Sequence, residues 1–218
     1  MKKLNINING NTKLKNTDKI RFMIWNLPAE VTCPYATELC KKSCYAKKAE
    51  RIYKNVLPCR EKNFLDSYEP EFVENMIYTI ELYLNSKAFK GKKAIFRIHE
   101  SGDFYINDYV TKWIDIAKHF ENDNRIIFTT YTKSIIYFVN NGYNTEQFPK
   151  NFIVRSSLWS DTDITLNHIT YNYNFPVFTA VKRFPENNRY FTECRGFDCG
   201  TCLKCYNNHY KNIAVKIH

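Results

Sequence analysis

Several kinds of segment are absent from this sequence. No apolar run approaches the ~18 residues that a membrane-spanning helix needs. The start, Met1-Lys2-Lys3, continues into polar, asparagine-rich sequence instead of the apolar core of an export signal, so we expect a cytoplasmic, intracellular protein without a membrane partner. Internal repeats, linkers rich in Gly, Ser or Pro, and low-complexity tracts are also missing. The 218 residues are therefore expected to form one domain.

Cysteine, in contrast, is abundant, with eight residues. In a reducing compartment this number argues against a disulfide framework and for metal binding. The formal net charge of +10 permits a nucleic acid or nucleotide as partner. Thiolate-bound clusters are anionic and would offset part of that charge, and the joint abundance of Lys, Asn, Ile and Tyr is also typical of an AT-rich genome. Charge alone therefore leaves the nucleic-acid partner open.

After a polar lead-in over residues 1–20, apolar runs alternate with amphipathic stretches. Strands are predicted at residues 21–27, 94–98, 126–130, 152–156, 177–181 and 213–218. Helices are predicted over residues 37–68, interrupted at Pro58, and over 71–84, 107–120, 134–139 and 163–171. Strands joined by helices imply parallel pairing with right-handed crossovers. The fold class is therefore α/β: a partial, six-stranded parallel β/α barrel, centred on residues 21–183, rather than a full eight-stranded one.

Polar side chains follow the predicted strands, at the edge where ligands bind in parallel α/β folds. They are Asn26 and residues 99–103, 131–133, 155–157 and 182–183. Arg155 stands inside the apolar run FIVRSSLW, where a buried charge needs a partner, so we expect it in a site. Trp25 and Trp159 lie at strand ends, where they can line a pocket.

Four of these polar residues are candidate catalytic groups: His99, Glu100, Asp103 and Lys133. His99 suits a general acid/base or a metal ligand, and a hydrogen-bonded structural histidine is the alternative. Glu100 and Asp103 flank a glycine turn and can bind a polar substrate group, although Asp103 can equally cap the next helix. Lys133 either holds an anionic substrate or lies in solvent at a helix start.

A group of four cysteines lies in the stretch CRGFDCGTCLKC, at Cys194, Cys199, Cys202 and Cys205. Its C-x2-C-x2-C core has the spacing of bacterial ferredoxins, whose thiolates bind [4Fe-4S] clusters. Gly196 and Gly200 let the backbone fold close to a metal. Zinc sites more often use two separated C-x2-C pairs, so iron–sulfur is favoured and zinc is the alternative metal. We call residues 194–205 the second cysteine group.

The first cysteine group comprises Cys33, Cys40 and Cys44, directly after the first predicted strand. Cys40 and Cys44 are four residues apart, which places both on one face of the predicted helix. Three ligands leave two alternatives. Either one iron of a cluster stays open for a substrate or cofactor, or Cys59 is the fourth ligand. Cys59 can also be a small buried apolar residue.

A three-cysteine loop after the first strand of a partial barrel resembles the radical S-adenosylmethionine (SAM) enzymes, although the spacing here is C-x6-C-x3-C. The sequence is more similar to phage-encoded, radical-SAM-like proteins. It is most similar to an uncharacterised phage and mobile-element family. The motifs of that family are LPA…CP…C…CYA, R-I-H-x-S-G-D-F, YTK and a cysteine-rich tail ending in His. The matching residues here are Leu27 to Ala29, Cys33 to Ala46, Arg97 to Phe104, Tyr131 to Lys133 and His218.

This resemblance implies an iron–sulfur protein with two [4Fe-4S] clusters, the second one auxiliary. It implies that SAM binds an open iron of the first cluster. Contacts to the SAM amino group would come from Glu100, Ser101 and Gly102, and contacts to its carboxylate from Arg155 and Ser156. An electron donor would be needed. The expected function is a radical-SAM-like enzyme acting on a nucleotide or nucleic acid. A non-catalytic iron–sulfur protein, or a zinc module, that binds nucleic acid is the alternative.

Overall fold

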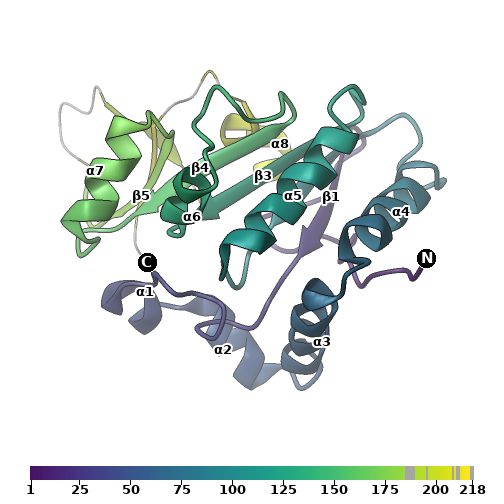
Figure 1. Cartoon of the computed structure of the whole chain (residues 1–218), viewed down its shortest axis with the longest axis horizontal. Helices are drawn as coiled ribbons and strands as arrows, with labels where there is room; N and C mark the ends of the chain where they lie inside the picture. Colours follow the sequence, from purple (N-terminus) through teal and green to yellow (C-terminus); the bar gives the residue numbers. More distant parts are fainter. Residues whose placement is uncertain (185–189, 195, 208, 210–211, 217–218) are drawn as a thin grey trace.

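The computed structural model describes residues 1–184, 190–194, 196–207, 209 and 212–216. Seven parallel strands form one curled sheet, a half-barrel, in the order β1-β2-β3-β4-β5-β7-β6 (Figure 1). They are β1 (Ile20–Trp25), β2 (Lys93–Ile98), β3 (Ile126–Thr132), β4 (Phe152–Leu158), β5 (Val177–Val181), β6 (Thr192–Cys194) and β7 (Asn212–Lys216). Trp25 pairs with Ile98, and Ile98 pairs with Thr130. This register places the carboxyl ends of the strands along one edge.

The helices form two groups around the sheet. Four of them, α4 (Phe72–Leu84), α5 (Asn107–His119), α6 (Ile135–Asn140) and α7 (Ile164–Asn172), cover its outer face (Figure 1). Three others, α1 (Glu38–Lys42), α2 (Tyr45–Ile52) and α3 (Val56–Tyr68), lie beyond the carboxyl end of β1. A short α8 (Cys199–Cys202) and a 3₁₀ turn, η1 (Lys204–Tyr206), precede β7.

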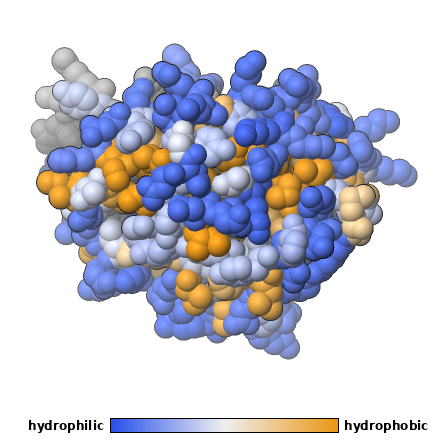
Figure 2. Space-filling view, viewed as in Figure 1, coloured by the Kyte–Doolittle hydropathy of each residue, from blue (hydrophilic) through white to orange (hydrophobic). Residues whose placement is uncertain are grey.

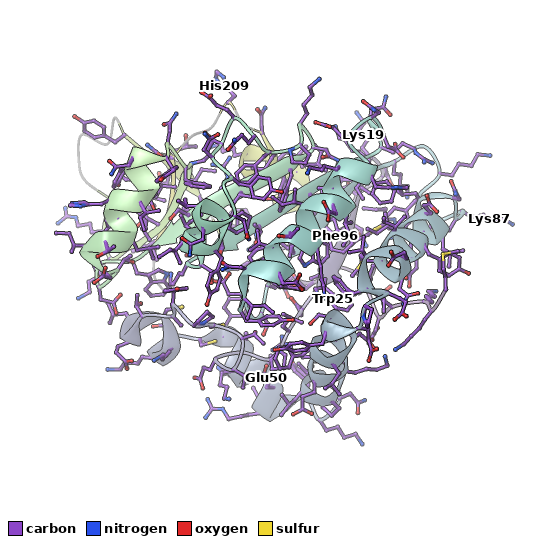
Figure 3. The ribbon with its side chains drawn as sticks, viewed as in Figure 1. Lys19, Trp25, Glu50, Lys87, Phe96 and His209 are labelled. Carbon is purple, nitrogen blue, oxygen red and sulfur yellow. The ribbon has the colours of Figure 1, made fainter. Side chains whose placement is uncertain are left out.

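Strand alternation divides the core in two. On the outer face, Trp25 and Phe96 pack against α4 and α5, and both lie deep between sheet and helices (Figure 3). On the inner face, Phe22, Ile24 and Ile95 pack against the chain around Cys205 and Tyr206. The second cysteine group therefore fills the inside of the half-barrel, in the place where a closed barrel would have its interior side chains.

The polar lead-in is closely attached to the domain. Leu4, Ile6 and Leu14 are buried, at 3%, 4% and 5% exposure. Asn7 forms an antiparallel bridge with Ile24, which covers the exposed edge of β1. The carbonyl of Lys13 accepts a hydrogen bond from Cys199 N at 2.9 Å, so the lead-in also contacts α8.

Most predicted elements are confirmed, and two corrections concern β6 and Pro58. Six strands were expected and seven are found in the described residues, because β6 has only three residues and carries no alternation signal. Pro58 does not interrupt a helix: it lies in the first turn of α3, where its missing N–H has no intrahelical acceptor. No helix in the described part of the chain has the length and apolar character needed to cross a membrane. The predicted terminal His218 lies outside the described residues.

Candidate functional site

The first cysteine group lies at the carboxyl edge of the sheet. Cys40 is in α1, whereas Cys44 is the N-cap of α2, where its sulfur accepts a hydrogen bond from Lys47 N at 3.4 Å. The expected single helix carrying both cysteines is therefore wrong, since α1 ends at Lys42. Burial, together with the charges of Asp103, Cys40 and Cys44, raises the pKa of the Cys33 thiol to about 12. These three thiols thus lie within electrostatic reach of one another.

Asp103 connects the turn after β2 to the end of β3. Its carboxylate accepts hydrogen bonds from Phe104 N at 2.8 Å, Thr132 Oγ1 at 2.5 Å and Lys133 N at 2.9 Å. Burial raises its pKa, although these three donors act in the opposite direction. Asp103 does not cap α5, whose N-cap is Ile106 without a side-chain bond, so the capping alternative is wrong.

Lys133 is a buried cation beside the first cysteine group. Its side chain donates to Ser157 O at 2.9 Å and Ser157 Oγ at 3.0 Å, and its Nζ lies 5.4 Å from the Trp159 ring centroid. The residue is only 4% exposed, so the alternative of a solvated lysine is wrong. Burial lowers its pKa, and the negative charges of Cys40 and Asp103 oppose that shift.

The turn after β2 fits closely against the segment that leads to Cys33. Gly102 has φ +82°, and a Cβ there would lie 2.6 Å from Leu27 Cβ and 2.6 Å from Thr32 Oγ1. Ser101 Oγ donates to Leu27 O at 2.8 Å. Glycine is therefore required at this position by both conformation and space. Ser101 and Gly102, expected to contact SAM, hold the cysteine loop against the sheet.

His99 lies inside the outer-face core. Its ring packs on Phe104 and Tyr109, its Nε2 lies 3.1 Å from Tyr109 OH, and it is 2% exposed. Burial, aided by the charge of Arg97, lowers its pKa to about 3, so the imidazole is neutral. Its φ of +62° is uncommon for a residue with a side chain. The structure separates His99 from Glu100, whose carboxylate accepts a hydrogen bond from Asn11 Nδ2 at 2.5 Å.

Arg155 and Ser156 point to opposite faces of β4. Ser156 Oγ lies 2.7 Å from Thr170 Oγ1 of α7, on the outer face. Arg155 is fully buried on the inner face, where it donates to Cys205 O and Asn207 O, both at 3.1 Å. The two residues expected to meet one SAM carboxylate are therefore not brought together. Arg155 binds the backbone of the second cysteine group instead.

The second cysteine group runs across the inner face. Cys194 ends β6, Cys199 and Cys202 bound α8, and Cys205 is in η1. Burial raises the pKa of Cys205 to about 11, and nearby Cys194 contributes through its charge. A Cβ at Gly200 would lie 2.3 Å from Lys15 O, so a glycine is required here for the contact with the lead-in.

All eight cysteines are free thiols. Among the described residues, no three His, Cys, Asp or Glu side chains are arranged to hold a single metal ion. A cubane cluster requires a different arrangement of ligands, because each thiolate binds its own iron atom. Three free thiols that lie within electrostatic reach of one another and of buried Lys133 are compatible with that requirement. Cys59 lies in α3, and its sulfur accepts a hydrogen bond from Asn5 Nδ2 at 2.8 Å.

Sequence reasoning missed three contributors to this edge. The guanidinium of Arg97 lies 3.6 Å from the Tyr131 ring centroid, on the inner face. Like Arg155, Arg97 is a charged residue inside an apolar strand, and this sequence feature could have identified it. Tyr45 OH donates to Glu100 O at 2.7 Å, and Asp161 Oδ2 accepts from Leu39 N at 2.8 Å. The last two contacts join distant segments and have no local signal.

Comparison with known proteins identifies the family. The family model described as Gene product 88 matches residues 3–213. This chain belongs to the Gene product 88 family. The Gene 88 protein of Mycobacterium phage D29 is 28% identical over 188 residues, which are 81% of this chain and 78% of that protein. The Gene 88 protein of Mycobacterium phage L5 is 26% identical over the same shares.

No solved structure matches this chain. The expected membership of a phage protein family is confirmed by the Gene product 88 matches. Neither relative's name states an activity, so the iron–sulfur and radical-SAM assignments stay predictions.

Proposed function

We propose that this Gene product 88 protein is an iron–sulfur protein that resembles radical SAM enzymes. Cys33, Cys40 and Cys44 would hold a [4Fe-4S] cluster with one open iron, and the second cysteine group would hold an auxiliary cluster. The observation that supports this most is the electrostatic coupling of three free thiols at the carboxyl edge of an all-parallel half-barrel, beside buried Lys133 and Asp103.

The residues around the first group have separate tasks in this proposal. The cation of Lys133 would offset the charge of the neighbouring thiolates, and Asp103 would hold Lys133 in place through its backbone N–H. Gly102 and Ser101 would keep the loop that carries Cys33 against the sheet. A cluster held by these residues would supply one-electron reducing chemistry toward SAM, with the electron coming from a separate donor.

The second group has its own support. Arg155 and Arg97 place two guanidinium groups on the inner face against which this group packs. An anionic, thiolate-bound cluster on this face would be stabilised by the two neighbouring guanidinium charges.

Anaerobic purification with iron and sulfide quantification tests this function, followed by EPR of the reduced protein during a SAM titration. About eight irons per chain are expected for two cubanes, with a signal that SAM changes. Cys40→Ala should lose about half of the iron. Zinc without iron would sink the proposal.

Cys59→Ala is the matched variant. The Cys59 sulfur already has Asn5 as a partner, so we expect iron content and the SAM response to be unchanged. If Cys59→Ala lost as much iron as Cys40→Ala, and SAM did not change the signal of the parent protein, Cys59 would be the fourth ligand of a closed cluster. That result would exclude the enzymatic mechanism.

A further inference from the structure

The carboxyl ends of β4 and β5 border a hollow of about 640 Å³ that the proposed cluster chemistry does not use. Its walls include the aromatic side chains of Trp159, Tyr171 and Phe191, and the cationic side chains of Lys182 and Arg183. The volume lies within the usual range of ligand sites. Aromatic rings beside cations are the two components with which proteins bind single-stranded nucleic acid.

The aromatic part of the hollow is accessible. Tyr171, near the end of α7, is 60% exposed, so its ring can be reached by a ligand. Apolar Leu158 and Val177 form part of the wall behind it. Figure 2 shows apolar residues reaching the surface over α6 and α7, amid hydrophilic neighbours. Such rings stack on the faces of unpaired bases whatever their sequence.

The charge of the hollow favours an anionic ligand. Lys182 and Arg183 line it directly after β5, and none of the described lining residues is acidic. The carboxylates of Asp161 and Asp163, on the neighbouring loop, accept hydrogen bonds from backbone N–H groups at 2.8 and 2.7 Å. The formal net charge of +10 acts in the same direction. A phosphate is the anionic group that accompanies a nucleobase.

The hollow adjoins the first cysteine group. The Trp159 ring, one of its walls, lies 5.4 Å from Lys133 Nζ. Asp161, two residues further on, accepts the 2.8 Å hydrogen bond from Leu39 N, next to Cys40. A ligand in the hollow would therefore extend toward the edge where the cysteine loop lies.

We propose that this hollow binds an unpaired nucleobase of a single-stranded nucleic acid. The base stacks on Trp159 and Tyr171, and the adjoining phosphate is held by Lys182 and Arg183. Binding of the base in the hollow does not depend on the proposed function. The further idea, that this binding delivers a substrate to the first cysteine group, rests on the proposed function.

Fluorescence anisotropy of the full chain with labelled single strands of about 16 nucleotides, the upper site size of small binding folds, tests the stacking. DNA and RNA strands are compared, since both carry the base and phosphate. Tyr171→Ala should weaken binding about 10-fold. Tyr173→Ala is the control, because Tyr173 is 42% exposed at the end of the same helix and lies outside the hollow. Equal effects of the two variants would overturn the proposal.

Salt dependence tests the phosphate contact. Lys182→Ala should lower the slope of log Kd against log salt by about 0.7, the value of one phosphate contact on a single strand. Lys87→Ala is the control, since Lys87 is at the opposite end of the molecule from α7 (Figure 3). Unchanged slopes in both variants would overturn the assignment of Lys182.

Two further measurements distinguish failure of this inference from failure of the proposed function. Equal affinity for duplex DNA, or for a free mononucleotide, would overturn the single-strand assignment. A parent protein without iron that still binds the strand would sink the proposed function and leave this inference standing.

Discussion

Arg60 Nη1 donates to Glu50 Oε1 at 2.9 Å, and both side chains are buried. The same carboxylate oxygen accepts a hydrogen bond from Ala29 N at 2.8 Å, and Arg60 also donates to Ala46 O at 3.1 Å. Glu50 lies where α2 and α3 meet, beyond the carboxyl end of β1 (Figure 3). This pair therefore joins two helices to the segment that leads into Cys33.

Glu50→Ala should lower the free energy of unfolding by about 3–5 kcal/mol, because it leaves the guanidinium of Arg60 buried without its partner. Urea unfolding followed by circular dichroism measures this. Glu61→Ala removes an exposed glutamate of α3, next to Arg60, and should change stability by no more than about 0.5 kcal/mol. A similar small effect in both variants would show that the pair does not support the cysteine loop.

Gly102→Ala should destabilise the protein more than Gly142→Ala. Both glycines have positive φ, at +82° and +79°, so both variants carry the same conformational strain. Only at Gly102 does a Cβ meet other atoms, at 2.6 Å from Leu27 Cβ and Thr32 Oγ1. We expect a difference of about 1–3 kcal/mol, the usual cost of overpacking. Equal unfolding midpoints would mean that the turn can move away from the loop.

His99 should make the protein less stable in acid. Burial lowers its pKa from the ordinary 6.5 to about 3. Between pH 6.5 and pH 3, His99 is therefore protonated in the unfolded chain and neutral in the folded chain. This contribution to the free energy of unfolding is complete above 6.5 and falls by about 1.4 kcal/mol for each pH unit below it.

The measurement is urea unfolding across that pH range, in the parent and in His99→Asn. Asparagine tolerates the positive φ and does not titrate. Other groups titrate in both proteins, so the difference between the two curves isolates His99. Parallel curves would contradict a neutral, buried His99.

Lys133→Met should make the first cluster harder to reduce, on the proposed function, because it removes a buried positive charge next to Cys40. The midpoint potential from an EPR-monitored redox titration should become more negative. Lys41→Met is the control, since Lys41 lies in α1 beside Cys40 but is exposed and pairs with Glu38. A potential that moves equally in both variants would exclude a specific role for Lys133.

Local patterns allowed most of the fold to be predicted. Apolar runs placed six of the seven strands, and helical spacing placed α4, α5, α6 and α7 within about two residues. The lead-in escaped this reasoning, because Leu4, Ile6 and Leu14 are isolated apolar residues in asparagine-rich sequence. Their burial depends on the edge of β1 and on α4, which are far away along the chain.

The sequence by itself determined which residue types stand at the carboxyl ends of the strands and how the cysteines are grouped. It did not determine the partners of Arg155, nor which of the polar residues are close to Cys33. Tertiary structure decided that Asp103 and Lys133 join the first cysteine group, whereas His99 enters the outer-face core. The reason is physical: helix and strand depend on neighbours within a few positions, whereas burial, charge pairing and pKa depend on segments brought together only by strand pairing and side-chain packing.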